Sequence, residues 1–150
     1  MNPRRLCKDG PMERIVVGVD GSDESWAGFD AALRLASTEG ASVTAVHAEH
    51  LSAWSSLGLG ATLGEVYEAD ERIREQLEAE ARERGRELVV EIGVVTRSGR
   101  PAGVLIDVAK ELDADLIVVG HRGHGGATSW IGSVANEVVH RSPISVLIAR

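Results

Sequence analysis

Short apolar segments alternate with helical segments along nearly the whole chain, and this alternation limits the possible folds more than any other feature. The apolar segments cover residues 14–19, 42–48, 87–95, 115–119 and 144–149. Amphipathic or capped helices are expected between them, over residues 23–39, 65–84, 101–112 and 132–141. Strands that alternate with helices form parallel sheets with right-handed crossovers and helices on both faces. The sequence therefore predicts an α/β fold: one open, doubly wound, parallel five-stranded sheet.

Hydrophobic patterns and capping residues set the expected bounds of the elements. The first, fourth and fifth strands are nearly continuous and β-branched, as strands covered on both faces are, while the second and third alternate more and are expected nearer an edge. Ser22 is suited to cap the helix that begins at Asp23, and Gly40 is suited to end it. The second helix is expected to expose a face rich in Glu and Arg and to bury Val66, Ala69, Ile73 and Leu77.

Charge and cysteine content narrow the class of protein. A formal net charge of −7 without a dense basic run argues against a nucleic-acid partner. No apolar run approaches the ~18 residues of a membrane span, and none follows the basic residues near the N-terminus, so neither a membrane span nor a signal peptide is expected. Cys7 is the only cysteine, which fits a reducing compartment. We expect a cytoplasmic protein with a flexible tail over residues 1–12, a domain over residues 13–150 and a mobile loop over residues 51–64.

A glycine-rich segment follows the fourth strand and leads into the last helix. It contains Gly120, Gly123, Gly125 and Gly126, and it ends at Gly132 and Ser133. Backbone N–H groups that no Cβ atom obstructs, next to the positive end of a helix dipole, suit an anion such as phosphate. Glycine-rich connections can also be merely flexible, but the order strand, glycine loop, helix favours phosphate binding.

Asp20 lies where the first strand ends, at the edge of the sheet where open α/β folds bind ligands. A carboxylate at the end of a buried strand needs a partner. Asp20 could accept a hydrogen bond from a ribose hydroxyl or a nucleobase. It could also cap the first helix, although Ser22 can fill that role.

Several familiar catalytic and metal-binding motifs are missing. His121 and His124 are three residues apart but have no cysteine or carboxylate beside them, so we expect no protein metal ligands. They are expected to be phosphate-side donors or exposed rings, and His47 in the second strand to be packed and hydrogen-bonded. The chain has no Walker-type loop, no G-x-S-x-G elbow and no dinucleotide fingerprint.

The combination of these motifs resembles the universal stress protein family. The stretch VVGVDGS from Val16 to Ser22 looks like the first-strand signature of that family. The stretch from Leu116 to Arg150, LIVVGHRGHGG followed by IGSVANEVVHRSPISVLIAR, is similar to its C-terminal third. The resemblance covers roughly residues 13–150.

The resemblance implies a strand order of 3-2-1-4-5 and an ATP site, with Mg²⁺ accompanying the ligand, between strands one and four. Asp20 would meet the ribose, and backbone at Val19, Ala48 and Val119 would line the adenine pocket. The expected phosphate-side residues are Gly120, Arg122, Gly123, His124, Gly132, Ser133 and Val134. Family members commonly dimerise through the last strand, which here begins at Ile144 and ends at Ala149.

One departure from the family pattern leaves other functions open. Eight residues separate Gly123 from Gly132, one fewer than in ATP-binding members. ATP binding, with occupancy rather than turnover as the signal and at most slow hydrolysis, is the favoured hypothesis. The main alternative is a dimeric stress-response interaction module without a nucleotide. An enzyme of adenylate chemistry on a related fold is a further alternative.

Overall fold

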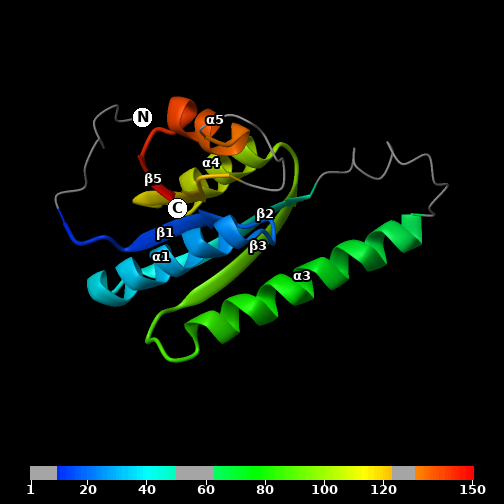
Figure 1. The fold of residues 1–150 in the computed structure, drawn as a ribbon, viewed down its shortest axis with the longest axis horizontal. Helices are drawn as coiled ribbons and strands as arrows, with labels where there is room; N and C mark the ends of the chain where they lie inside the picture. The colour runs from blue at the N-terminus through cyan, green and yellow to red at the C-terminus, as the bar shows by residue number, and fades with distance from the viewer. Residues whose placement is uncertain (1–9, 50–62, 123–130) are drawn as a thin grey trace.

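The computed structural model describes residues 10–49, 63–122 and 131–150, with only the helical backbone described for residues 63–67 (Figure 1). A single five-stranded parallel sheet has the order β3-β2-β1-β4-β5. Its strands are β1 (Arg14–Gly18), β2 (Ser42–Glu49), β3 (Ile92–Ser98), β4 (Leu116–Gly120) and β5 (Ser145–Ala149). The predicted fold class and strand order are confirmed.

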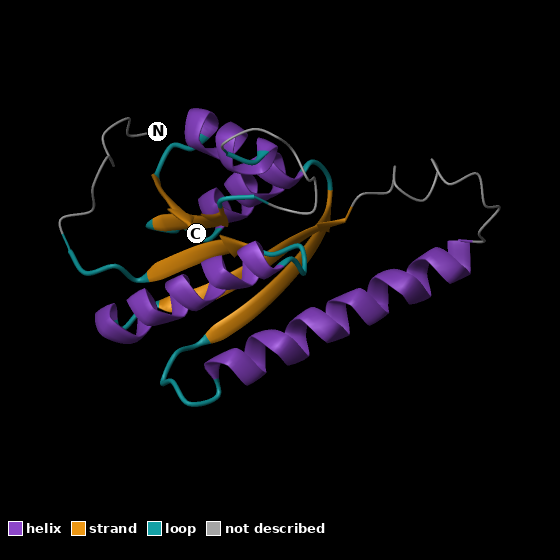
Figure 2. Ribbon diagram, viewed as in Figure 1, coloured by secondary structure: helices purple, strands orange, loops and turns teal. Residues whose placement is uncertain are grey.

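Helices cover both faces of this sheet, as predicted (Figure 2). On one face lie α1 (Asp23–Glu39) and α3 (Leu63–Gly85), and on the other lie α4 (Pro101–Glu111) and α5 (Ser133–Arg141). Within the described ranges, no helix is both long enough and apolar enough to cross a membrane.

Alternating strand residues supply two hydrophobic cores. Ile15 and Val17 pack toward α1 and α3, whereas Val16 packs toward α4 and α5. All three side chains are fully buried, and each such burial contributes about 1.5–3 kcal/mol to folding. The sheet is thus held to both helical layers by neighbouring residues of one strand.

β1 is the central strand, paired with β2 on one side and β4 on the other. Ile15 is level with Val43 and with Leu116. Asp115 fastens the start of β1, because its Oδ2 accepts hydrogen bonds from the N–H groups of Glu13 (2.8 Å) and Arg14 (3.0 Å). The first strand, β1, is therefore held in place by neighbours that lie far along the sequence.

α1 begins and ends where its sequence predicts. Ser22 adopts an extended conformation, and its Oγ accepts a hydrogen bond from the N–H of Ser25 at 3.2 Å. Gly40 has a positive φ of 75°, a conformation that glycine adopts without strain, and its N–H donates to Ala36 O at 2.9 Å. Both predicted caps are confirmed.

The third strand begins later than predicted. β3 starts at Ile92 rather than at residue 87. Leu88 is exposed and Val89 fully so, and the N–H of Leu88 bonds to Gly85 O in the turn that follows α3. An apolar run shows its β-propensity but not the residue at which pairing starts, so the prediction was wrong for residues 87–91.

The expected positions of the edge strands need a correction too. β2 pairs with strands on both sides, so its alternating pattern does not mark an edge. The edges are β3 and β5, and β5 is the more continuously apolar of these two. Most of the β5 side chains are only half-buried, so its continuous pattern does not reflect full cover on both faces.

α3 buries less of its predicted apolar stripe than its sequence indicates. Leu77 is 6% exposed, but Ile73, one turn earlier, is 36% exposed, Ala69 is half-buried, and Val66 lies outside the residues whose side chains are described. The reason is geometric: the N-terminal half of α3 extends past the sheet (Figure 1). The predicted loop over residues 51–64 lies outside the described residues, except that its last two belong to α3.

The C-terminal half of α3 is fastened to α1 by Arg84. Its guanidinium lies 5.0 Å from the centroid of the Trp26 ring, and its Nη1 donates to Asp30 Oδ2 at 2.7 Å. Partial burial lowers the pKa of Arg84, but hydrogen bonds to Asp30 and Glu80 outweigh this, so the pKa is raised overall. The remaining α3 ion pairs are largely exposed, such as Glu68–Arg72 at 3.5 Å, as expected of a solvated face.

Candidate functional site

The strand order places a topological switch point between β1 and β4. From β1 the sheet grows through β2 and β3 in one direction, and through β4 and β5 in the other. Ligands of open α/β sheets bind beyond the carboxyl ends of the strands at such a point. We call residues 19–22, 120–122 and 132–134 the switch-point edge. They follow β1, end and follow β4, and cap and begin α5.

Hydrogen bonds hold the segment after β1 to β2 and to α1. The N–H of Val19 donates to Val46 O at 2.9 Å, and Val19 O accepts a hydrogen bond from His47 Nδ1 at 3.0 Å. The N–H of Asp20 donates to Ser25 Oγ at 3.3 Å. The prediction that His47 is hydrogen-bonded is confirmed. Sequence reasoning did not single out Ser25, a buried hydroxyl that would have read as an ordinary helix residue.

Asp20 supports the start of α1. Its Oδ1 accepts hydrogen bonds from Ser22 N–H at 2.9 Å and from Ser22 Oγ at 2.5 Å. Ser22 Oγ in turn accepts from the N–H of Ser25 and so caps α1. The sequence offered capping of this helix as an alternative role for Asp20, and Asp20 and Ser22 share that role. The residue as a whole is solvent-exposed at the switch-point edge.

Gly120, which ends β4, has a packing role that the sequence did not indicate. A Cβ atom added to it would lie 2.6 Å from Glu24 O and 2.8 Å from Glu24 C. These are backbone atoms in the first turn of α1, so neither can move aside alone. The absence of a side chain therefore lets α1 rest against the end of β4.

The loop after β4 is closed at its base. The N–H of His121 donates to Ala149 O at 2.8 Å, and the N–H of Gly132 donates to His121 O at 2.7 Å. The amide of Gly132 is thus bonded within the protein and is not directed at a ligand. Arg122 is exposed, while Gly123 and His124 lie outside the described residues.

α5 begins beside the hydrogen bond between Gly132 N–H and His121 O. Gly132 is its N-cap, with φ −65° and ψ 155°, and no side chain of the described residues caps the helix. The first intrahelical bond runs from Asn136 N–H to Gly132 O at 2.9 Å, so the N–H groups of Ser133 and Val134 precede it. The first turn of α5 also has no acidic residue. Such a helix start attracts anions.

The residues predicted to line the adenine pocket lie at the same edge of the sheet. Gly18 is level with Val46, and Val119 is level with Ile148. Ala48 and Val119 both pack on the α4/α5 side, with β1 between their strands. Val19, which follows β1, packs on the α1/α3 side, so these residues lie near the ends of three adjacent strands but on both faces of the sheet. Their role in binding a base stays a prediction.

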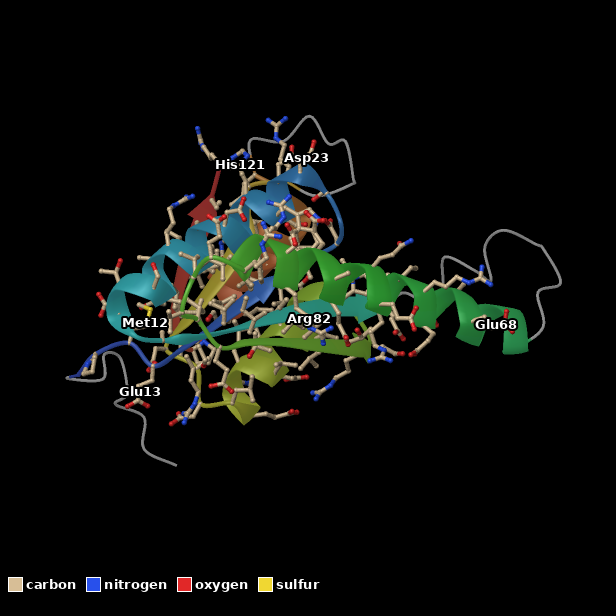
Figure 3. All side chains as sticks on the ribbon, turned by 90° about the horizontal axis from the view of Figure 1, so that it is seen from below. Met12, Glu13, Asp23, Glu68, Arg82 and His121 are labelled. Atoms are coloured by element: carbon tan, nitrogen blue, oxygen red, sulfur yellow. The ribbon has the colours of Figure 1, made fainter. Side chains whose placement is uncertain are left out.

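The side chains at this edge do not suggest a metal centre. In the part of the chain that the structure describes, no group of three or more His, Cys, Asp and Glu side chains could hold a metal ion. His121 is half-buried after β4, and Asp23 in the first turn of α1 lies at the same end of the molecule (Figure 3).

Comparison with known proteins gives consistent results. A family model described as the universal stress protein family matches residues 12–150. The universal stress protein YxiE of Bacillus subtilis is 32% identical over 148 residues, which cover 91% of this chain and 98% of that protein. The universal stress protein Mb2028c of Mycobacterium bovis is 34% identical over 91% of this chain, but the match spans only 45% of its length.

Solved structures share the fold. The universal stress protein UspA from Lactobacillus plantarum has a TM-score of 0.82 and 26% identity, covering 95% of this chain and all of that one. A universal stress protein in complex with cAMP has a TM-score of 0.68 and 27% identity, covering 94% and 98% of the two chains. A protein from Archaeoglobus fulgidus in complex with dAMP has a TM-score of 0.64 at 23% identity, covering 92% and 98%.

Proposed function

The chain belongs to the universal stress protein family, and we propose that it binds an adenine nucleotide, with ATP as the favoured ligand, at the switch-point edge. The observation that carries the proposal is the start of α5. It has no side-chain cap from the part of the chain that the structure describes and no acidic residue in its first turn, and it lies beside the carboxyl end of β4. Related structures with cAMP and dAMP support an adenine nucleotide as the class of ligand.

The ligand lies across the ends of the central strands. Asp20 contacts the ribose, and backbone at Val19, Ala48 and Val119 lines the adenine pocket. The phosphates, with Mg²⁺ when ATP is bound, lie near the start of α5, where the N–H groups of Ser133 and Val134 are donors. The remaining phosphate-side residues are Gly120, Arg122, Gly123, His124 and Gly132. Because its N–H is bonded to His121 O, Gly132 gives the phosphates space rather than a hydrogen bond.

Calorimetric titration of nucleotide-stripped protein tests the proposal. Mg-ATP, AMP and cAMP are titrated separately, and thermal unfolding is followed at millimolar ligand. Binding of at least one adenine nucleotide, with a higher unfolding temperature in its presence, is the expected result. GTP is the matched control for the base. Absence of both heat and stabilisation for all three adenine nucleotides would remove the proposal.

A second candidate function follows from the hydrogen bond between Gly132 N–H and His121 O. This bond closes the base of a loop that is one residue shorter than in ATP-binding relatives. If the closed base excludes phosphates, the protein acts as a dimeric interaction module in the stress response. Absorbance of freshly purified protein distinguishes the two functions, because a co-purified adenine nucleotide adds a band near 260 nm.

We also propose that the protein is a cytoplasmic homodimer that pairs through residues 144–149. β5 is an edge strand in which Val146, Leu147 and Ile148 are half-buried, and pairing with a second copy would cover that edge. Val146→Lys should then convert the dimer to a monomer in sedimentation experiments. No catalytic residue is assigned, and any ATP hydrolysis is slow.

A further inference from the structure

His47 makes a hydrogen bond that determines the state of its ring. Its Nδ1 lies 3.0 Å from Val19 O, and a carbonyl oxygen can only accept. Nδ1 therefore carries a proton, which makes the neutral ring the Nδ1–H tautomer. The ring is half-buried in β2, level with Thr96 of β3.

The acceptor belongs to the peptide unit that leads into Asp20. Val19 C=O and Asp20 N–H are the two polar groups of one planar unit. His47 bonds the first of them, and Ser25 Oγ accepts from the second at 3.3 Å. One peptide plane is thus held at both ends by side chains, one from β2 and the other from α1.

This arrangement controls where the Asp20 carboxylate lies. With its plane held at both ends, the peptide before Asp20 cannot rotate without breaking two hydrogen bonds. On the far side of Asp20, the bonds from Ser22 hold Oδ1. Loss of the His47 bond would release the carbonyl end and let Asp20 shift.

We propose that His47 is a positioning residue of the nucleotide site, which acts with Ser25 to orient the Val19–Asp20 peptide and, through it, the Asp20 carboxylate toward the ribose. This inference rests on the proposed function. His47 does not touch the nucleotide in this scheme, so its effect is on recognition of the ribose and not of the phosphates.

Titrations with AMP, its 2′-deoxy and 3′-deoxy analogues, and ATP test the inference. His47→Leu removes the donor, whereas His47→Asn supplies an amide N–H near the position of Nδ1. We expect His47→Leu to weaken AMP roughly tenfold, the equivalent of one hydrogen bond, and to reduce the preference for AMP over the deoxy analogues. The ratio of ATP to AMP affinity should stay unchanged, and His47→Asn should restore most of the loss.

His140→Leu is the matched control. His140 Nδ1 also bonds to a backbone carbonyl, Asn136 O at 2.7 Å, but it lies in the last turn of α5 and is exposed. Its replacement should leave every affinity and ratio at the wild-type value. Ser25→Ala removes the acceptor at the other end of the peptide and should reduce the same ribose preference.

The outcomes separate this inference from the proposed function. Wild-type protein that binds neither AMP nor ATP would overturn this inference, and if it also fails to bind cAMP it would overturn the proposed function as well. Wild-type protein that binds, together with a His47→Leu variant that keeps the full ribose preference, would overturn the role of His47 alone. If His47→Leu does not fold, Ser25→Ala decides the question in the same way. Nitrogen NMR of the ligand-free protein at pH 8 is independent of binding, and an Nε2–H tautomer for His47 would also overturn the inference.

Discussion

The first turns of α1 and α5 both lie at the switch-point edge. Side chains cap the first turn of α1, whereas no side chain of the described residues caps that of α5. α1 has the cap Ser22, the supporting carboxylate of Asp20, and the acidic residues Asp23 and Glu24 in its first turn. α5 starts at Gly132, with no side-chain cap from the described residues and no first-turn acid. Both helices have the same backbone dipole, so the side chains account for the difference.

The contrast separates a helix start with a structural role, at α1, from one that we propose binds a ligand, at α5. At α1, side-chain oxygens accept from the N–H groups of Ser22 and Ser25, acidic residues offset the positive end of the dipole, and the turn packs on Gly120. At α5, no side chain of the described residues caps the N–H groups of Ser133 and Val134, which is why we propose them as donors to an anion. A motif search that scores only glycines would rank Gly120 and Gly132 alike, although their surroundings differ.

Gly120→Ala should have the largest effect. Its Cβ would lie 2.6 Å from Glu24 O, so the first turn of α1 must shift, and we expect a loss of about 3 kcal/mol in the free energy of unfolding. Urea denaturation measures it.

Two glycine substitutions are controls for this result. In Gly132→Ala the Cβ lies 3.1 Å from Arg122 Cα, a milder conflict that should cost about 1 kcal/mol. Gly103→Ala, in α4, meets nothing within 4 Å and should be neutral or stabilise by about 0.5 kcal/mol. A cost at Gly120 no greater than at Gly132 would contradict the packing role.

Ser133→Asp should weaken ATP binding on the order of tenfold or more. It places a carboxylate at the start of α5, where like charges would lie close together. Calorimetry with ATP and adenosine measures the change, and adenosine binding should be unaffected. The matched change at the other helix is Asp23→Asn, which should alter ATP affinity by less than about twofold because that charge is exposed and screened. The reverse result would assign the phosphates to α1.

Ser22→Ala should lower the free energy of unfolding by about 1 kcal/mol, because it removes the α1 cap and the hydroxyl that bonds Asp20. Ser133→Ala, an exposed position that caps nothing, should change it by less than about 0.5 kcal/mol. Urea denaturation compares the two variants. Equal losses would show that the first turns of α1 and α5 do not differ as described.

Asp20→Asn should have the smallest effect on stability. The amide oxygen of Asn still accepts from Ser22, so the loss should be less than about 0.5 kcal/mol, measured by the same method. A loss above about 1 kcal/mol would show that charge, rather than hydrogen bonding, holds the start of α1.

Much of the fold could be predicted because its signals are local. Helix caps such as Ser22 and Gly40 act within one turn, so α1 was assigned to the residue. The start of β3 and the buried stripe of α3 were not predicted correctly, because both depend on where the sheet ends in space. Ile73 fits the helical pattern but is exposed, and the N-terminal half of α3 extends past the sheet (Figure 1).

The candidate site also contains residues that local sequence signals indicate and residues that they do not indicate. Asp20, Gly132 and Ser133 were predicted as site residues from strand ends and helix starts, which local sequence signals indicate. The packing of Glu24 against Gly120 joins residues almost a hundred positions apart, and nothing near either residue signals it. Ser25 was missed for a similar reason: its acceptor role depends on how the chain turns between β1 and α1.

The central place of β1 has a consequence for synthesis and folding. The ribosome releases β1 early, but its β4 neighbour, at Leu116, leaves the tunnel only after some hundred further residues. Until then one side of the central strand has no partner, and the nascent chain carries an open edge that other chains can join. A nascent chain arrested before residue 116 should therefore need a chaperone, whereas the full-length chain can close its own sheet.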